Sequence, residues 1–173
     1  TLDLTTLPAD EQPSVSYAET SDATVFVITG RMIWLYGQTL YDSALAAIDA
    51  GRDLVIDLGR CEHMDSTLLG TLHELTLCAE TAGKNLTFQN VPQPLVESFE
   101  ELSMKGVLNH IGTEPISLPD QLTGIDLRAT HGSRQQQRLL KAHEFLAELS
   151  DDNREQFGGL VETLRSELGE AGS

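Results

Sequence analysis

The chain is short of positive charge. Its 173 residues include 11 lysines and arginines against 27 aspartates and glutamates, which gives a formal net charge of −16. Such a protein repels phosphate backbones and acidic membrane surfaces over a Debye length of about 8 Å. We therefore expect neither nucleic acid nor a membrane as a partner. An acidic composition is also common among freely soluble proteins, and that explanation requires no special function.

Long apolar runs and cysteines are also scarce. No run approaches the roughly 20 apolar residues that a membrane span needs. Residues 1–13 carry acids and prolines where a signal peptide would have a basic and then an apolar segment. The two cysteines, Cys61 and Cys78, cannot form a dense disulfide framework. We therefore expect a cytoplasmic protein with both thiols reduced.

Sequence motifs of several enzyme classes are missing. The chain has no Gly-x-x-x-x-Gly-Lys-Ser/Thr phosphate loop, and Ser66 lies outside any Gly-x-Ser-x-Gly motif. Four residues of metal-ligand type, Cys61, His63, His73 and Cys78, lack the paired Cys-x-x-Cys spacing of a structural zinc site. We expect no catalytic residue, no metal and no cofactor, and any ATP would have to come with a partner.

The most informative segment joins an apolar strand, a short polar loop and an apolar helix at an Asp65-Ser66-Thr67 triplet. Residues 54–58 are typical of a buried strand, and from Leu68 to about residue 82 apolar residues recur at helical spacing. Either hydroxyl then lies at the start of the helix. A phosphate on Ser66 would find unpaired N–H groups and a positive dipole there. The same hydroxyl is also explained as a simple N-cap.

Strands and helices alternate over the rest of the first two thirds of the chain. With 40% hydrophobic residues, the length suits one substantial core. We expect a flexible lead-in over residues 1–14. The pattern then predicts strands at 15–19, 24–29, 54–58, 86–90 and 116–118, and helices at 38–50, 66–82 and 94–104, with a break at Gly106. This order predicts an α/β fold, a mixed sheet with helices packed on it.

The end of the chain has a different pattern. Residues 119–133 lose hydrophobic periodicity and suggest a linker, and residues 134–169 form an amphipathic helical extension in two parts, with Asp152 and Glu155 placed as a capping box. Each part carries an apolar stripe: Leu139, Leu140, Ala142, Phe145, Leu146 and Leu149, then Phe157, Leu160, Val161, Leu164 and Leu168. The stripes must be buried on the core, on each other or on another subunit, and the sequence leaves these alternatives open.

Three segments resemble the STAS domain of anti-sigma-factor antagonists. The first is Val-Ile-Asp-Leu at 55–58, followed by a loop, the Asp-Ser-Thr triplet and a Leu-rich helix. The second is Ala-Gly-Lys-Asn-Leu-Thr-Phe-Gln-Asn-Val-Pro at 82–92, and the third is Leu-Val-Glu-Ser-Phe-Glu-Glu-Leu-Ser-Met-Lys-Gly-Val-Leu at 95–108. Their order and spacing agree over roughly residues 15–118. One departure is Leu68, because many members have glycine there, and here the glycine comes at Gly70.

The resemblance implies a STAS-like mixed sheet and a non-enzymatic, protein-binding regulator of transcription and signal transduction. In that family the unmodified protein captures an anti-sigma serine kinase, and serine phosphorylation ends the capture. Ser66 matches the phosphoacceptor, with Thr67 as a second hydroxyl, and Asp65, Ser66, Thr67 and Leu68 match the partner-binding segment. The implied partners are an anti-sigma-type serine kinase and a phosphoserine phosphatase. A phosphate adds about −1.5 to −2 charge and would weaken binding to an acidic partner.

Two other interpretations remain at this stage. A structural subunit with the same fold could assemble through its sheet domain and C-terminal helices, as a homo-oligomer, with Ser66 only capping its helix. A response-regulator receiver would use Asp57, at the end of a strand, as its phosphoacceptor. That fold needs an acidic pair after its first strand, where this chain has Gly30-Arg31-Met32. We therefore expect Asp57 to be structural.

Overall fold

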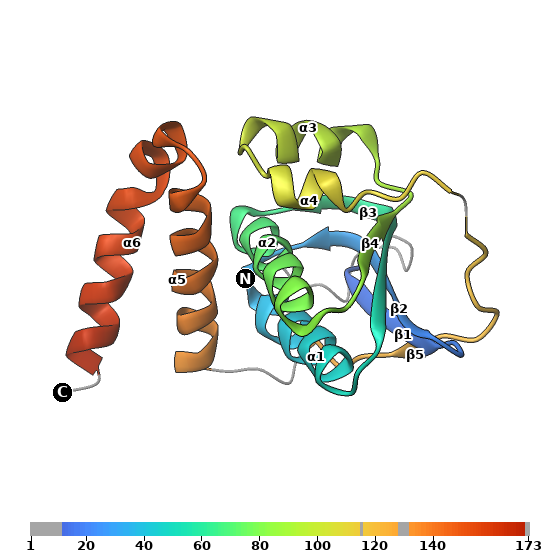
Figure 1. The fold of residues 1–173 in the computed structure, drawn as a ribbon. Helices are drawn as coiled ribbons and strands as arrows, with labels where there is room; N and C mark the ends of the chain where they lie inside the picture. Colours follow the sequence, from blue (N-terminus) through green and yellow to red (C-terminus); the bar gives the residue numbers. More distant parts are fainter. Residues whose placement is uncertain (1–11, 115, 128–131, 172–173) are drawn as a thin grey trace.

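The protein is built around one five-stranded sheet with helices stacked beside it (Figure 1). The computed structural model describes residues 12–114, 116–127 and 132–171. The strand order in the sheet is β4-β3-β2-β1-β5. β1 is antiparallel to both β2 and β5, whereas β2, β3 and β4 are parallel. The strands are β1 (Ser14–Glu19), β2 (Ala23–Met32), β3 (Asp53–Met64), β4 (Leu86–Gln89) and β5 (Thr123–Gly124).

Four of the helices, α1, α2, α5 and α6, form successive layers beside this sheet. α1 and α2 contact β3, α5 packs on α2, and α6 packs on α5, so that α5 stands between α6 and the α1–α2 layer (Figure 1). The helical segments are η2 (Trp34–Tyr36), α1 (Gly37–Asp49), α2 (Ser66–Ala82), α3 (Gln93–Glu101), α4 (Lys105–Asn109), α5 (Ser133–Glu148) and α6 (Asp151–Ala171). Mixed strands with helices on the sheet confirm the predicted α/β class.

The core lies between the sheet and the α1–α2 layer. β2 is the central strand of the sheet, and its residues Val25, Phe26, Val27 and Ile28 are all buried. α2 contributes its apolar face, and α5 and α6 extend the same cluster outward. The largest fully buried side chains are Phe26, Phe88, Phe99, Ile28, Met32, Leu40, Leu54, Ile56, Leu58, Leu68, Leu72 and Leu75.

The strand before the Asp-Ser-Thr triplet is longer than its apolar run predicts. β3 continues through residues 59–64, which we expected to be a polar loop. β2 supplies the reason, because Thr29 pairs with Arg60 and Met32 pairs with Met64 beyond two irregularities in register. Backbone pairing with a long neighbour thus overrides the polar side chains.

The chain after residue 110 also departs from expectation. The strand predicted at 116–118 is wrong: β5 lies at Thr123–Gly124, inside the predicted linker, and pairs with Ser16 and Tyr17 of β1. The edge of β1 would otherwise leave backbone N–H and C=O groups unpaired, and β5 pairs with part of that edge. Gly106 is within α4, and the break falls instead at Ser103, whose φ is +56°.

Both ends of the chain contain further differences. Of the lead-in predicted for 1–14, residues 1–11 lie outside the described residues, and β1 begins at Ser14. The capping box at Asp152 and Glu155 is wrong, because α6 begins at Asp151 and Ser150 Oγ accepts the Asn153 N–H at 3.0 Å. In the two C-terminal apolar stripes Ala142, Leu146, Phe157, Val161 and Leu164 are buried, whereas Leu160 is 40% exposed.

Candidate functional site

Asp65 forms the N-terminus of α2. It has an extended backbone, and its Oδ1 accepts the Leu68 N–H at 3.1 Å, whereas its Oδ2 accepts the Trp34 N–H at 2.6 Å. The N-cap is therefore Asp65, and the alternative interpretation of Ser66 as the N-cap is wrong. A carboxylate suits this position because it meets both the free N–H groups and the positive end of the helix dipole.

Ser66 is the first residue of α2, is half-buried, and bonds to a residue far along the chain. Its Oγ lies 2.8 Å from Nε2 of His143 in α5, and His143 Nδ1 lies 2.7 Å from the Leu139 carbonyl oxygen. A carbonyl only accepts, so Nδ1 carries the proton and Nε2 of the neutral ring accepts the Ser66 O–H. Burial lowers the pKa of His143, which outweighs the opposite effects of the Leu139 carbonyl and of Asp65. The ring is therefore neutral near pH 7.

The four residues expected to bind a partner do not lie on one exposed surface. Asp65 and Ser66 are half-buried, whereas Thr67 is 2% exposed and Leu68 is fully buried. The Thr67 carbonyl accepts the Thr71 hydroxyl within the helix at 2.8 Å. In this structure only Asp65 and Ser66 reach the surface, and the two following residues contribute packing.

Gly70 explains how α5 approaches α2 so closely. A Cβ built on Gly70 would lie 2.4 Å from the Ala142 carbonyl oxygen and 2.8 Å from its Cβ. Both distances are shorter than real contacts allow, so α5 needs a residue without a side chain here. The sequence places glycine two positions after the family's usual site, and the structure gives that glycine a packing role against the C-terminal extension.

Charged side chains join the same helices. The Arg138 guanidinium in α5 forms a buried ion pair with Glu74 in α2 and lies 4.2 Å from the centre of the Tyr41 ring. At the exposed end, Arg134 Nη2 lies 3.0 Å from each carboxylate oxygen of Asp42 in α1. Sequence reasoning missed the roles of Arg138 and His143. Their signal was a histidine and an arginine among the apolar positions of an otherwise amphipathic helix.

Trp34 is a further residue that sequence reasoning missed. It is 38% exposed, one of the few large hydrophobic side chains at the surface in the described part of the chain, and its N–H bonds to Asp65. Exposed tryptophans beside polar groups are common anchors of protein interfaces. This bond uses the backbone N–H of Trp34 and places its main chain beside Asp65, the residue before Ser66.

The residues of metal-ligand type are dispersed. Among the described residues, no three histidine, cysteine, aspartate or glutamate side chains are grouped to hold a metal ion. Burial raises the pKa of the Cys61 thiol to about 11, so Cys61 is protonated and a poor ligand. His63 is exposed on β3, whereas His73 and Cys78 lie on α2.

Asp57 occupies a structural position in β3. It is 1% exposed, and its carboxylate accepts the Asn90 side-chain amide at 2.6 Å and the Gly59 N–H at 3.0 Å. The sheet also contradicts the receiver interpretation, because β1 and β2 are antiparallel and a receiver sheet is parallel. Asp57 thus holds the β3 backbone at Gly59 and the Asn90 side chain after β4.

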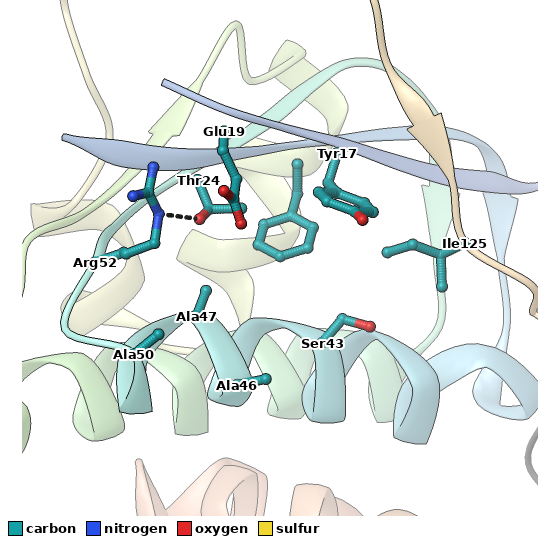
Figure 2. Close-up of a pocket in the computed structure, with 10 residues that line it drawn as sticks. Tyr17, Glu19, Thr24, Ser43, Ala46, Ala47, Ala50, Arg52 and Ile125 are labelled. Carbon is teal, nitrogen blue, oxygen red and sulfur yellow. Dashed lines mark hydrogen bonds between the residues drawn. The ribbon is translucent and has the colours of Figure 1, made fainter. Parts of the chain in front are cut away.

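One cavity lies beside the sheet and a second lies beside Ser66. The first cavity, of about 310 Å³, lies between β1 and β2 on one side and α1 on the other. Arg52 lines it and donates from Nε to the Thr24 hydroxyl oxygen (Figure 2). The Arg52 guanidinium also donates to the Thr20 and Ala23 carbonyls. The second, of about 210 Å³, adjoins Ser66 and is lined by Leu69, Ser98, Glu101, Leu102, Gln156 and Phe157. The second cavity is therefore lined by both the serine and an acidic residue, Glu101.

Comparisons with known proteins show the family to which the chain belongs. No curated protein matches the sequence. A solved structure titled as the anti-sigma factor antagonist SpoIIAA in its unphosphorylated form is similar, with 16% identity over 50% of this chain and 81% of that chain and a TM-score of 0.46. No helix in the described residues is long and apolar enough to cross a membrane. The family model described as "Mlab, STAS domain" matches residues 15–110, more than half of the chain, which therefore belongs to this STAS domain family.

Proposed function

We propose that this protein is a non-enzymatic regulatory module that binds a protein partner and is switched by phosphorylation of Ser66. One observation carries the proposal. The Ser66 hydroxyl lies at the first turn of α2 beside the Asp65 cap, half-buried and held by one hydrogen bond to neutral His143. Membership of the STAS family supports a binding role, and the resemblance to anti-sigma-factor antagonists supports a switch at this position.

The chemistry of the site explains why a phosphate would act as a switch. An ester on Ser66 Oγ removes the O–H that His143 Nε2 accepts, so the bond between α2 and α5 is lost. The added charge of about −1.5 to −2 would also face Asp65 and, across the small cavity, Glu101. Repulsion between these like charges disfavours the present packing and any acidic partner surface. Phosphorylation would therefore change the surface around Trp34 and Ser66.

The partners of this proposal are proteins. An anti-sigma-type serine kinase would bind the unmodified chain and supply ATP, because this sequence contains no phosphate loop. A phosphoserine phosphatase would restore the unmodified form. The exposed aromatic of Trp34 and the carboxylate of Asp65 offer such a kinase an anchor and a charge beside the hydroxyl.

Intact-mass measurement of the protein isolated from its native host tests the proposal. We expect a fraction heavier by one phosphate, mapped to Ser66 by fragmentation, and absent from Ser66→Ala. Ser98→Ala is the matched control, because Ser98 lines the same cavity and is also half-buried. Phosphate found only at other residues while Ser66 stays unmodified with active kinase would contradict the proposal.

The Ser66–His143 bond also favours a second candidate function. A STAS subunit that assembles without phosphorylation would use this hydroxyl only to fasten α5 to α2. In that case Ser66→Ala would loosen the C-terminal helices, and the host protein would carry no phosphate. Light scattering of the purified chain would then show a stable oligomer whose mass falls when the C-terminal helices are perturbed.

A further inference from the structure

α5 has the charge pattern of a helix that depends on its docking surface. Its first nine residues contain Arg134, Arg138 and Lys141, three of the 11 basic residues in the chain, and no acid. Arg134 lies in the first turn, where a positive charge opposes the helix dipole, and no side chain of the described residues caps this end at Gly132. The contacts of α5 with α1 and α2 must therefore supply much of its stability.

The surface beneath α5 is complementary in charge. Asp42 of α1 forms an ion pair with Arg134, and Glu74 of α2 forms one with Arg138. The second pair is buried, with 8% of the Glu74 side chain and 3% of the Arg138 side chain exposed. A buried ion pair is a weak source of stability because both charges lose their hydration. Arg138 Nε has no hydrogen-bond partner within the described residues, which adds to that cost. The Glu74–Arg138 ion pair therefore contributes more to the specificity of helix docking than to the stability of the fold.

The same surface is shaped for the backbone of a helix. Gly70 lets the Ala142 carbonyl approach α2 more closely than any residue with a Cβ would allow. Arg138 and Ala142 are four residues apart and therefore share one face of α5. A helix with a basic residue four positions before a small residue can therefore pair its basic residue with Glu74 and place its small residue against Gly70, as α5 does with Arg138 and Ala142.

We propose that the groove between α1 and α2 is a helix-docking surface, which α5 occupies in this structure and which a partner helix with an arginine four residues before a small residue occupies after α5 leaves. Departure of α5 also removes His143 from Ser66 and uncovers the start of α2. Only this last consequence, control of access to Ser66, rests on the proposed function. The docking surface itself does not.

Hydrogen exchange of the full chain tests whether α5 leaves. We expect the α5 and α6 amides to exchange together through an opening about 100-fold more frequent than the opening of β2 and β3. Ala142→Leu overfills the notch at Gly70 and should raise that opening about tenfold while leaving β2 and β3 unchanged. Gln137→Leu, on the exposed side of α5, should change neither. Exchange of α5 and α6 only together with the central strands would overturn the proposal.

A labelled peptide of residues 133–149 tests whether the vacated groove accepts a helix in trans. We expect it to bind the Ala142→Leu chain about tenfold more tightly than the wild-type chain, in which α5 fills the groove. A peptide with Arg138→Gln should lose about tenfold in affinity, and one with Gln137→Ala should not. Equal binding to both chains, or no binding to either, would overturn the docking surface.

A second variant covers the case in which Ala142→Leu fails to fold. Arg134→Glu faces Asp42 at the exposed end of the groove, and repulsion there should also raise the α5 opening, with recovery in Asp42→Arg/Arg134→Glu. Neither readout involves a kinase. Absence of phosphate on Ser66 in the host would therefore contradict the proposed function while exchange and peptide binding still decide the docking surface.

Discussion

The Ser66 hydroxyl in α2 is hydrogen-bonded at 2.8 Å to Nε2 of His143 in α5, 77 positions later in the chain. This contact ties the residue expected to regulate a STAS domain to a helix beyond the matched residues 15–110. Because His143 is neutral and its other nitrogen is held by Leu139, the serine is the donor. The C-terminal helices thus belong to the environment of the candidate site.

The capping role of Asp65 predicts unequal effects of substitutions at the start of α2. Asp65→Ala removes an N-cap and the acceptor of the Trp34 N–H, and we expect a loss of about 2 kcal/mol in the free energy of unfolding. Ser66→Ala removes one hydrogen bond and should cost about 1 kcal/mol. Urea unfolding checks the order, with Ser98→Ala as the control. A larger loss for Ser66→Ala than for Asp65→Ala would contradict the assignment of the cap.

Acidification should loosen the packing between α2 and α5. Burial lowers the pKa of both His73 and His143 from the ordinary 6.5, so the unfolded chain binds more protons than the folded one just below that value. Stability is complete above about pH 6.5 and falls as the pH decreases toward the lowered folded-state pKa values.

Urea unfolding at about pH 7.5 and about pH 5.5 checks this dependence. His143→Gln should reduce the difference in stability between the two pH values. His63→Gln is the control, because His63 is exposed on β3 and should leave that difference unchanged. A chain that is more stable at the lower pH would rule out the effect.

Two glycine substitutions should act in opposite directions. Gly70→Ala places a Cβ against the Ala142 backbone, and we expect a loss of about 1–3 kcal/mol because backbone cannot move aside as a flexible side chain would. Gly159→Ala lies on the exposed side of α6, where no described atom is within 4 Å of the new Cβ, and should gain about 0.5–1 kcal/mol. Thermal unfolding measures both. Equal changes in stability for Gly70→Ala and Gly159→Ala would contradict the close approach of Ala142 to Gly70.

The STAS domain should fold without its C-terminal helices. We expect a chain that ends at residue 130 to keep its circular dichroism per residue in the sheet region, to melt at a lower temperature, and to self-associate in light scattering. The reason is that Leu69 and Leu72 are buried in the core cluster that α5 and α6 extend with Leu146 and Phe157. An unfolded truncated chain would mean that the helices are part of the core.

The purified chain should hydrolyse neither ATP nor simple esters. Ser66 and His143 have the geometry of a nucleophile and a base, but a backbone carbonyl in place of a carboxylate orients the histidine, and His143 is only 2% exposed. Turnover that survives several purification steps and disappears in both Ser66→Ala and His143→Gln would establish catalysis. Ser98→Ala serves as the control.

Local sequence determined the elements whose signals lie within a few residues. α2 starts after Asp65, whose carboxylate accepts the Leu68 N–H, and ends before Gly83, which adopts φ +70° and donates its N–H to the Ala79 and Glu80 carbonyls. α1, β4 and α5 likewise follow from their periodicity to within one or two residues. These signals suffice because caps and amphipathic faces are read from neighbouring positions.

Tertiary structure decided everything that depends on distant partners. β3 is extended by β2, β5 exists because the β1 edge accepts it, and the pairs Ser66–His143 and Glu74–Arg138 join α2 to a helix more than 60 residues away. No local pattern specifies which acid an arginine meets or which glycine faces an alanine. Those choices follow from the close packing of α5 on α2, which also places α5 beside the candidate site.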